Sequence, residues 1–556
     1  NTGQDGLGWE DSEKLGSRDD SFSMNMDDDG NVNYEWVGDN NDGEPYVDTQ
    51  NGFIKNTNAG LQYSNKWNEK QNLNVSPKFN KQIYTNNNSR LSQSQVGDTQ
   101  LNVDESTVTN VNRSNFKLKA IYDVKLDSVN SLKITANSNF YDTESDEFTN
   151  GTTTGSDGIL KNKQQRAFTT NSDKAVLFTS VLFKHKFAKP RRTFTVNSSW
   201  NMMNTNSNNF LKSSNESYVN GVFDTKNEID QNKIGDKTTK NFSASFSYSE
   251  PIAKQFSLQF SYQIAFDKGK NNYFTYDYSA NTGQYDQLVA SLSNEFDQAI
   301  ITHRPNLKLS YNAKKINYSI GSGFGFTSFD LLDKTMNKEY KRSYTNFFPS
   351  ASFSYKYKSN SNLRVNYYGR TIQPTLDQLQ PLRNNQDFFN QTLGNPDLKQ
   401  SFNNRIEIFQ SSYDMLTETQ FYQGIYFNTT TNAIIYSSII DPESAKTISK
   451  PINTNGNFSG NFYLGYGLKF NKIDMRADFS PFFGYIKSAL SINTVMGSSE
   501  NLNTGLSVYL SKSKQKKYDI NLSNRFTYNR NSTTQNSEIK SFNTNTLSLD
   551  MGVYFA

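Results

Sequence analysis

One short string near the start of the chain has the residue types and spacing of a metal-binding loop. Oxygen-bearing side chains alternate around a glycine, in the order Asn25, Asp27, Asp29, Gly30, Asn31 and Asn33. Calcium loops use this alternation and close with a bidentate glutamate at the twelfth position. Here that position is Trp36, and Glu35 comes one residue early. We expect an unliganded acidic surface loop here and no resident cofactor; the alternative is a calcium ion held by Asp27, Asp29 and Asn31.

The residue types that catalysis usually needs are scarce. The chain has no cysteine and only two histidines, His185 and His303. Each histidine shares strand parity with apolar residues, so we expect both to point toward the apolar side of their strands, at opposite rims and without an acid–base partner. The sequence also lacks the HExxH zinc motif and the nucleophile elbow of hydrolases. We therefore predict that the protein is not an enzyme.

Alternating apolar and polar residues over 242–266 indicate the kind of element that carries these side chains. In one run Phe256, Leu258, Phe260 and Tyr262 alternate with Ser257, Gln259 and Ser261. A strand sends successive side chains to opposite faces, so each run has one apolar and one polar face. The unit recurs along the chain, joined by tight turns.

This pattern predicts an all-β fold, a transmembrane antiparallel up-and-down β-barrel. Only 34% of the residues are hydrophobic, but a spanning barrel needs apolar side chains only on the outward half of each strand. A secreted sandwich array is the alternative. It would have inward faces rich in Val, Leu and Ile, whereas this chain has 41 Phe and 32 Tyr in long runs.

Short and long connections alternate along the chain. Tight turns are expected at 67–71, 126–130, 188–192, 250–254, 313–315, 358–361, 414–419, 470–472 and 513–517. The long polar segments between them are expected to be extracellular loops, and the tight turns to be periplasmic. Nine hairpins and a last run over 547–555 predict about 19 strands in these residues.

Bacterial single-chain barrels have even strand numbers, and plugged transporters have about 22 strands. We therefore expect residues 51–556 to be an outer-membrane barrel whose first strand and last two strands are not included. A closed barrel of about twenty strands is the alternative. We expect a location in the cell outer membrane.

Charge is distributed unevenly. Residues 1–50 hold fourteen acidic residues against Lys14 and Arg18, a net charge of −12, so we expect an acidic external loop there. The rest of the chain carries +16, partly at hairpin ends such as the lysines at 512–517. These lysines are expected to solvate turns or to contact phosphates of outer-membrane lipid, and no nucleic-acid partner is expected.

A glycine-rich string at 321–325 has the pattern G-x-G-x-G, but no helix follows it as nucleotide binding would require. By parity Phe324 and Phe326 face lipid, whereas Gly321, Gly323 and Gly325 face the lumen. Glycines at such positions ease curvature or let a bulky object approach the wall.

Two further segments carry a resemblance to a known family. The string RTIQPTLDQLQPLRNNQD at 370–387 and the string LGNPDLK at 393–399 resemble the barrel of TonB-dependent receptors, and most closely the related outer-membrane β-barrel family of Bacteroidota. The acidic opening stretch is similar to the first external loop of these proteins. Gln400 and Ser401 replace the Pro-Glu that usually follows. Pro396 fixes φ and holds Asn395 extended, so we interpret this motif as a loop-exit turn, with substrate contact as the alternative.

The resemblance implies import of a bulky nutrient, such as a glycan, a peptide or a chelate. It also implies TonB as a partner through a plug domain that is absent from this sequence, and a surface lipoprotein as a second partner. Tyrosines in the long segments, Tyr273, Tyr276, Tyr278 and Tyr285, suit stacking on such ligands. The alternative function is a non-transporting barrel that serves as scaffold or subunit of a larger outer-membrane complex with surface lipoproteins, for assembly or secretion.

Overall fold

The computed structural model describes residues 23–26, 32–35, 52–96, 99–380, 383–441, 443–515 and 517–554. Nearly all of these residues lie in strands; the helical elements among them are the short turn η1 (Ala290–Leu292) and the four-residue helix α2 (Leu376–Leu379). Within the described residues, none of the helices has the length and apolar character needed to cross a membrane. Strands β1 (Ser23–Met26) and β2 (Val32–Glu35) pair with each other as a separate antiparallel sheet.

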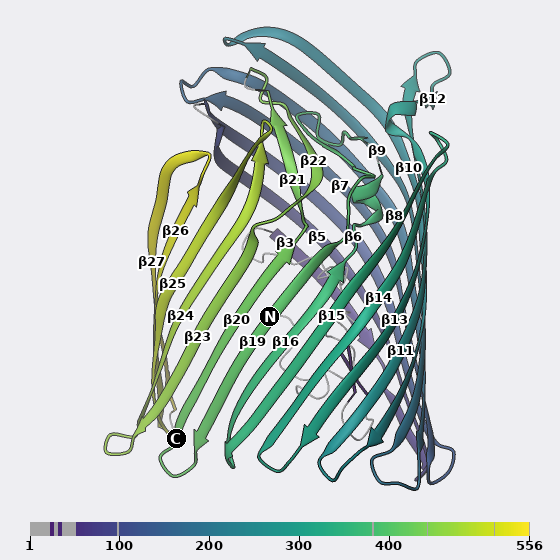
Figure 1. Cartoon of the computed structure of the whole chain (residues 1–556). Coiled ribbons are helices and arrows are strands. Elements are labelled where there is room, and N and C mark those ends of the chain that lie inside the picture. The colour runs from purple at the N-terminus through teal and green to yellow at the C-terminus, as the bar shows by residue number, and fades with distance from the viewer. Residues whose placement is uncertain are drawn as a thin grey trace.

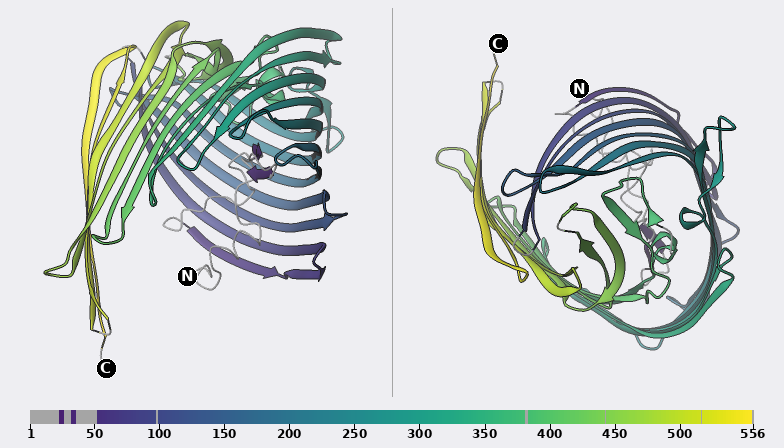
Figure 2. Two further views of the ribbon diagram at one scale, coloured as in Figure 1. Left: turned by 60° about the horizontal axis from the view of Figure 1, so that its bottom comes forward. Right: turned by 90° about the horizontal axis from the view of Figure 1, so that it is seen from above.

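One curved wall of strands follows chain order around a wide lumen (Figures 1 and 2). Its strands are β3 (Gly52–Gly60), β4 (Tyr63–Asn68), β5 (Gln71–Val96), β6 (Thr99–Lys125), β7 (Asn130–Gly155), β8 (Leu160–Lys186), β9 (Thr193–Val219), β10 (Val222–Pro251), β11 (Phe256–Ser279), β13 (Asn294–Asn312), β14 (Ile316–Asp333), β15 (Lys338–Lys358), β16 (Ser361–Ile372), β19 (Ser401–Asp414), β20 (Thr419–Thr431), β23 (Asn457–Phe470), β24 (Met475–Ile492), β25 (Val495–Lys514), β26 (Tyr518–Thr533) and β27 (Asn536–Val553). Short strands in the connections are β12 (Gln284–Leu288), β17 (Arg383–Asn384), β18 (Asn390–Leu393), β21 (Ala433–Ile440) and β22 (Thr447–Thr454).

Counted with β3 and β4 as one interrupted strand, nineteen strands form the wall in the described part of the chain, which confirms the number expected from the sequence. Neighbouring wall strands are antiparallel; β10, for example, keeps an unbroken register with β11 from Gln231↔Asp277 to Pro251↔Ser257. Such ladders satisfy the backbone N–H and C=O groups inside the sheet, as hydrocarbon requires.

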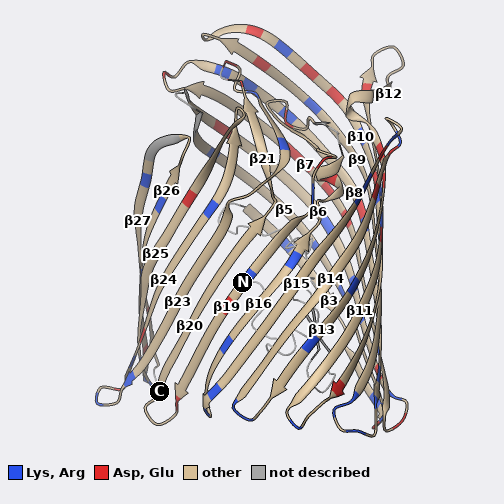
Figure 3. Cartoon of the chain, viewed as in Figure 1, with Lys and Arg blue, Asp and Glu red and all other residues tan. Residues whose placement is uncertain are grey.

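The short turns lie at one end of the wall, and each falls where the sequence predicts it. The turns at 126–130 and 188–192, for example, separate β6 from β7 and β8 from β9. Charged side chains of both signs lie at this end and on the long hairpins at the opposite end (Figure 3).

The long connections are mostly paired strands, whereas the sequence suggested irregular loops. Most are continuations of the two flanking strands, closed by short tips. At the β9–β10 tip, Asn220 and Gly221 both have positive φ values, 51° and 77°, as a type I′ hairpin turn requires. Outward apolar residues are needed only where the wall meets lipid, but backbone pairing can continue beyond that band through polar side chains. The amphipathic pattern therefore ends before the strand does.

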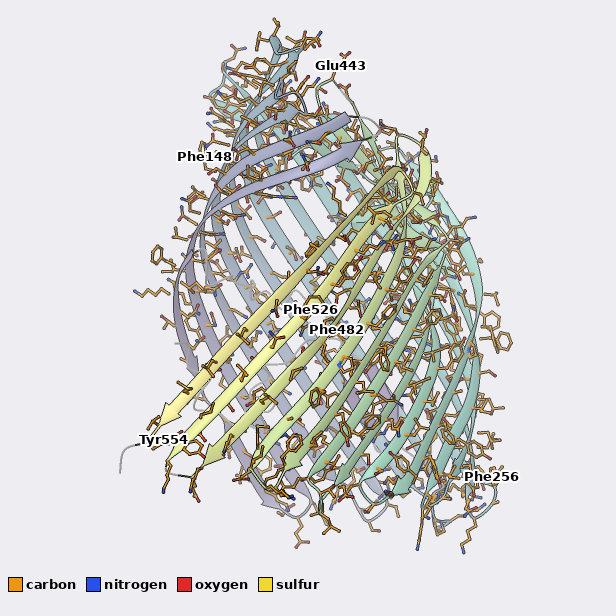
Figure 4. All side chains as sticks on the ribbon, turned by 90° about the vertical axis from the view of Figure 1, so that its left-hand side faces the viewer. Phe148, Phe256, Glu443, Phe482, Phe526 and Tyr554 are labelled. Carbon is orange, nitrogen blue, oxygen red and sulfur yellow. The ribbon has the colours of Figure 1, made fainter. Side chains whose placement is uncertain are left out.

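Burial across the wall is inverted relative to a soluble protein. On β11, Phe260 is 52% exposed, while Ser257 on the other face is 6% exposed. On β14, Ile320 and Phe324 are exposed, and the intervening glycines are buried on the lumen side, as predicted. Apolar side chains thus face outward and small polar side chains pack inside, which is the arrangement of a wall between lipid and a wet lumen. Figure 4 shows Phe256 at the short-turn end of this wall and Glu443 at the opposite end.

Candidate functional site in the barrel mouth

Two connections fold into the lumen at the long-hairpin end of the wall. They are residues 373–400, which contain α2, β17 and β18, and the hairpin of β21 and β22 at 433–454; we call them together the mouth insert. Seen from above, both lie inside the ring of wall strands (Figure 2, right). Strand β18 pairs in parallel with β22, from Asn390↔Thr447 to Thr392↔Ser449, so the two connections form one unit.

An apolar cluster anchors this unit to the wall. Leu376 and Leu379 of α2 and Leu398 beyond it pack on inward-facing residues of β13 and β14, among them Phe296 and Phe329. All five side chains are buried, and Leu379 and Phe296 are fully so. Burial of three leucines contributes about 5–9 kcal/mol of hydrophobic free energy before the entropy of ordering the segment is subtracted. The base of the insert is therefore a packed apolar core inside the lumen.

The Gly-Asn-Pro-Asp motif holds the exit of this segment against α2. A Cβ atom on Gly394 would lie 2.6 Å from the carbonyl carbon of Gln380, and closer still to its oxygen. The Asn395 amide donates to the Gln378 carbonyl at 2.6 Å, and the Asn395 side chain donates to the Pro451 carbonyl at 2.8 Å. These contacts support the interpretation of the motif as a structural loop-exit turn.

Arg342 of β15 points inward and secures the same turn. Its guanidinium donates to the carbonyl oxygens of Pro396 and Leu398, and it lies 3.7 Å from the Asp397 carboxylate. The side chain of Arg342 is 19% exposed, whereas that of Asp397 is 81% exposed. Because the carboxylate is in water, the ion pair contributes little, and the two bonds to buried carbonyls dominate.

Polar contacts attach α2 and the segment beyond it to β8, β10 and β11. At α2, the Asp377 carboxylate lies 2.7 Å from Lys237 Nζ, and Asn271 donates to Gln380 at 2.6 Å. Further along, Asp387 accepts a bond from Gln164 at 3.1 Å and lies 3.7 Å from Arg166. The Lys237–Asp377 pair is partly exposed and contributes little. The contacts of the outer part of the insert, beyond α2, with β8 are therefore polar, whereas α2 itself also packs on the leucine cluster.

Lys233 is the exception among these cations because it is buried. Its Nζ donates to Asn385 Oδ1, and the Asn385 side chain donates to Gln231 at 3.0 Å. Desolvation lowers the pKa of Lys233 to about 8, partly offset by the charge of Asp277. Lys233 lies well beyond the outward apolar band that ends at Phe242. It therefore titrates in the mouth of the barrel, where the insert meets the wall.

The lumen wall below the insert carries a group of aromatic side chains. The rings of Tyr426 and Tyr463 lie 6.0 Å apart at 22°, and the Tyr422 ring lies 6.2 Å from that of Tyr463. The guanidinium of Arg405 lies 5.7 Å from the centroid of the Tyr426 ring. Gly424 stands directly opposite Tyr463 across the sheet, so the ring can lie flat on the wall. Flat tyrosines with a neighbouring cation can stack on and hydrogen-bond to sugar or peptide groups.

The tyrosines that the sequence singled out are only partly brought together. Tyr278 and Tyr285 meet edge to face in the long β11–β12 connection, with ring centroids 5.3 Å apart, and Tyr285 also donates to Asp230 at 2.7 Å. Burial, followed by this hydrogen bond to Asp230, raises the pKa of Tyr285 to about 12. Tyr273 is separate from this pair and mostly buried, and burial raises its pKa to about 12. Tyr276 has no contact that would join it to this pair among those the structure describes.

The other predicted site residues are the calcium candidates near the start of the chain and the two histidines. Asp27, Asp29 and Asn31 fall outside the described residues, and the described part of the chain contains no group of three or more His, Cys, Asp or Glu side chains that could hold a metal. His185 Nδ1 lies 2.7 Å from Asn130, and His303 Nδ1 lies 2.7 Å from the Tyr262 hydroxyl. The absence of enzymatic activity stays a prediction.

Sequence reasoning missed the cations that hold the insert: Arg166, Lys233, Lys237 and Arg342. The sequence does contain one sign of these cations, because each of them lies beyond the run of alternating apolar residues on its strand. What the sequence could not supply was the partner, since the contacts of Lys233 and Lys237 span about 140 to 152 residues.

Several solved structures and the sequence model of one family match this chain. No curated protein sequence matches the chain. Solved structures that resemble it include the copper transporter OprC, with a TM-score of 0.44, 9% identity, and coverage of 90% of this chain and 76% of that one. A second is the RagAB peptide importer, with a TM-score of 0.42, 12% identity, and coverage of 82% of this chain and 62% of that one. A third is the siderophore receptor PirA from Pseudomonas aeruginosa, with a TM-score of 0.40, 9% identity, and coverage of 88% and 80%.

Scores and identities this low carry no argument about function. The sequence model of one family, in contrast, matches residues 185–553, which is more than half of the chain. The matched range includes the wall from the end of β8 to β27 and the whole mouth insert. The inverted burial of the wall agrees with the location that this family has. The chain therefore belongs to the outer membrane protein beta-barrel family, and its place is the bacterial outer membrane.

Proposed function

We propose that this chain is the barrel of a TonB-dependent receptor-like protein of the Bacteroidota type, which imports a bulky nutrient across the outer membrane. The observation that carries the proposal is the mouth insert, a folded unit held inside a lumen bordered by nineteen strands. Barrels of 16–18 strands already leave an aqueous channel, and wider ones are normally plugged. A wide lumen whose mouth holds a folded segment suits regulated passage of a large solute.

The two kinds of contact in the insert suit a gate. The leucine cluster fixes its base, while polar contacts such as Arg166–Asp387 and Lys233–Asn385 hold its outer part. A polar ligand can replace contacts of the second kind with hydrogen bonds of its own. A ligand that binds between the tip and the wall could therefore displace the tip without unfolding the base.

The proposed ligand class is a glycan, a peptide or a metal chelate. The lumen offers stacked tyrosines, the Arg405 cation and many amide side chains, which together recognise ring faces, hydroxyls and carboxylates. We further propose that TonB acts through a plug domain, that a surface lipoprotein covers the mouth, and that no enzymatic step is involved. Calcium bound by Asp27, Asp29 and Asn31 is proposed for the acidic segment. Its test is a calorimetric titration, in which a calcium-dependent heat should disappear in Asp29→Ala.

The test of import uses the absence of cysteine in the chain. Cysteines are introduced as Arg166→Cys and Asp387→Cys in the intact protein in cells, and are joined by a cleavable bifunctional thiol reagent. Uptake of labelled oligosaccharides, peptides and iron chelates is then measured in turn. We expect uptake of one class to stop on cross-linking and to return on cleavage, with Asp387→Cys alone as the control.

The competing function is a scaffold or subunit of an assembly or secretion complex with surface lipoproteins. Under that reading, gene deletion leaves uptake of every solute class unchanged, and the protein purifies in stoichiometric amounts with components of the larger complex. Such a result would reject import.

A further inference from the structure

Three lysines on the outer face of the wall form a cluster next to the lipid-facing band. Lys240 of β10 and Lys268 of β11 are directly opposite each other in the ladder, and Lys270 follows two residues further along the same face. All three side chains are exposed. Directly opposed side chains have Cβ atoms about 5 Å apart, and like charges there destabilise a sheet.

None of the three lysines has an ion pair or a side-chain hydrogen bond with another residue in the described part of the chain. The acidic side chains nearby are largely engaged elsewhere. Asp297, opposite Lys270, lies 2.6 Å from Lys334, and Glu339 lies 2.8 Å from Lys341. The cluster therefore keeps an excess of positive charge that the protein itself does not neutralise.

The position of the cluster relative to the membrane is set by its own strands. Phe242 and Phe266 are opposite each other, their rings lie 6.3 Å apart, and both point outward. Phe242 comes two residues after Lys240, and Phe266 comes two residues before Lys268. Two residues of a strand span about 7 Å, so both lysines lie about 7 Å along the strands from these rings, toward the long hairpins. That distance places them where acyl chains give way to head groups.

A cavity of about 500 Å³ lies at this cluster. It is lined by side chains and backbone of β10, β11, β13, β14 and β15, including the three lysines, Thr238, Asp297, Asp330 and Glu339. The surface is therefore concave rather than flat, with the lysines and the Thr238 hydroxyl on β10 and β11 and the carboxylates on β13, β14 and β15.

We propose that Lys240, Lys268 and Lys270 bind the phosphate groups of an anionic lipid in the outer leaflet. A phosphate is the anion that matches two opposed ammonium groups, because it accepts several hydrogen bonds at once. The adjacent aromatic pair supplies apolar contact for the acyl chains of the same molecule. Free phosphate could satisfy the lysines but gains nothing from Phe242 and Phe266, so a lipid source is favoured.

The test uses the purified full-length protein in detergent, with native mass spectrometry to count bound lipid. The probe is lipid A with two phosphates, titrated against the wild type and against the triple variant Lys240→Gln, Lys268→Gln and Lys270→Gln. We expect the triple variant to lose one tightly bound lipid A, because its affinity for that molecule should be about 100-fold weaker than that of the wild type. Each lysine near a charged lipid surface changes the affinity about fivefold, and three lysines together give about 100-fold. Inorganic phosphate at the same concentrations should not displace it.

A matched control lies at the short-turn end of the same strands. The triple variant Lys254→Gln, Lys314→Gln and Lys315→Gln removes the same charge from exposed turn positions and should leave lipid A binding unchanged. Equal loss in both triple variants, no loss in the first, or displacement by inorganic phosphate would each overturn the proposal.

A charge reversal separates lipid binding from a structural role. Lys268→Glu places opposite charges across the ladder at Lys240. We expect this variant to lose lipid A binding and yet, without lipid A, to unfold at a temperature equal to or higher than that of the wild type. A lower unfolding temperature with lipid A binding retained would show that the lysines serve the wall and not a lipid.

Discussion

Gly394→Ala should loosen the mouth insert without disturbing the wall. The added methyl group would lie 2.6 Å from the Gln380 carbonyl carbon and closer to the oxygen, whereas ordinary contacts begin near 3.4 Å. Both partners are backbone, so no side chain can rotate away, and the chain at 394–398 must move by an ångström or more.

The contacts that this movement breaks set the size of the effect. They are the Asn395 amide bond to Gln378, the Asn395 side-chain bond to Pro451, and the two carbonyl bonds from Arg342. Neutral hydrogen bonds contribute about 1 kcal/mol and those to a charged group about 1.5–3 kcal/mol. With partial relaxation, we expect the free energy of local opening to fall by about 3 kcal/mol.

Hydrogen exchange measures this opening directly. A loss of about 3 kcal/mol corresponds to roughly 100-fold faster exchange of amides in the insert, such as those of Asn395, Leu398 and Thr447. Amides of the β10–β11 ladder should keep their rates. The control is Gly151→Ala, where an added Cβ meets nothing closer than 4.0 Å. Unchanged exchange in the insert of Gly394→Ala, or faster exchange throughout the wall, would refute the reasoning.

Three further predictions concern the wall and the mouth. Phe260→Lys, on the lipid face, should cost about 2–4 kcal/mol of unfolding free energy in lipid vesicles, whereas Ser261→Lys on the lumen face should be tolerated. Because burial lowers the pKa of Lys233 from 10.5 to about 8, the unfolded chain binds more protons between these values. The insert should therefore become more stable as pH rises from 8 to 10.5. Hydrogen exchange of the insert amides, corrected for the pH dependence of the intrinsic exchange rates, measures this stability. The dependence on pH should vanish in Lys233→Met. Arg342→Met should expose residues 390–400 to limited proteolysis while the wall stays resistant; equal cleavage of wild type and variant would contradict the role of Arg342.

The wall could be predicted from the sequence because its information is local. The alternation of Phe256, Leu258 and Phe260 with polar residues specifies a strand and both of its faces, and each tight turn specifies the next partner. Register then follows, since a slip by one residue would turn every aromatic side chain into the lumen. Strand number, turn positions and the inward parity of the glycines on β14 all depend on this local information.

The ends of the long hairpins could not be located in the same way. Residues such as Asn208 and Asn227 have low intrinsic strand preference, and nothing apolar marks the face they present. They are strands because the ladder begun in the membrane continues to pair their backbones. Pairing of this kind costs little extra loop entropy once the hairpin has formed, but it leaves no period-2 apolar pattern to read.

The mouth insert depends on contacts that no local pattern encodes. The strings at 370–399 resemble a family motif, yet the motif does not reveal that Leu379 and Leu398 pack on Phe296 and Phe329, up to about a hundred residues away. Inside a barrel these leucines have no lipid to face, so their burial requires a second apolar surface within the lumen. The wall supplies it where β13 and β14 turn Phe296, Phe329 and Leu331 inward above the glycine-rich stretch. The departure of these strands from a purely polar lumen face is thus the sequence-level sign that something folds against them.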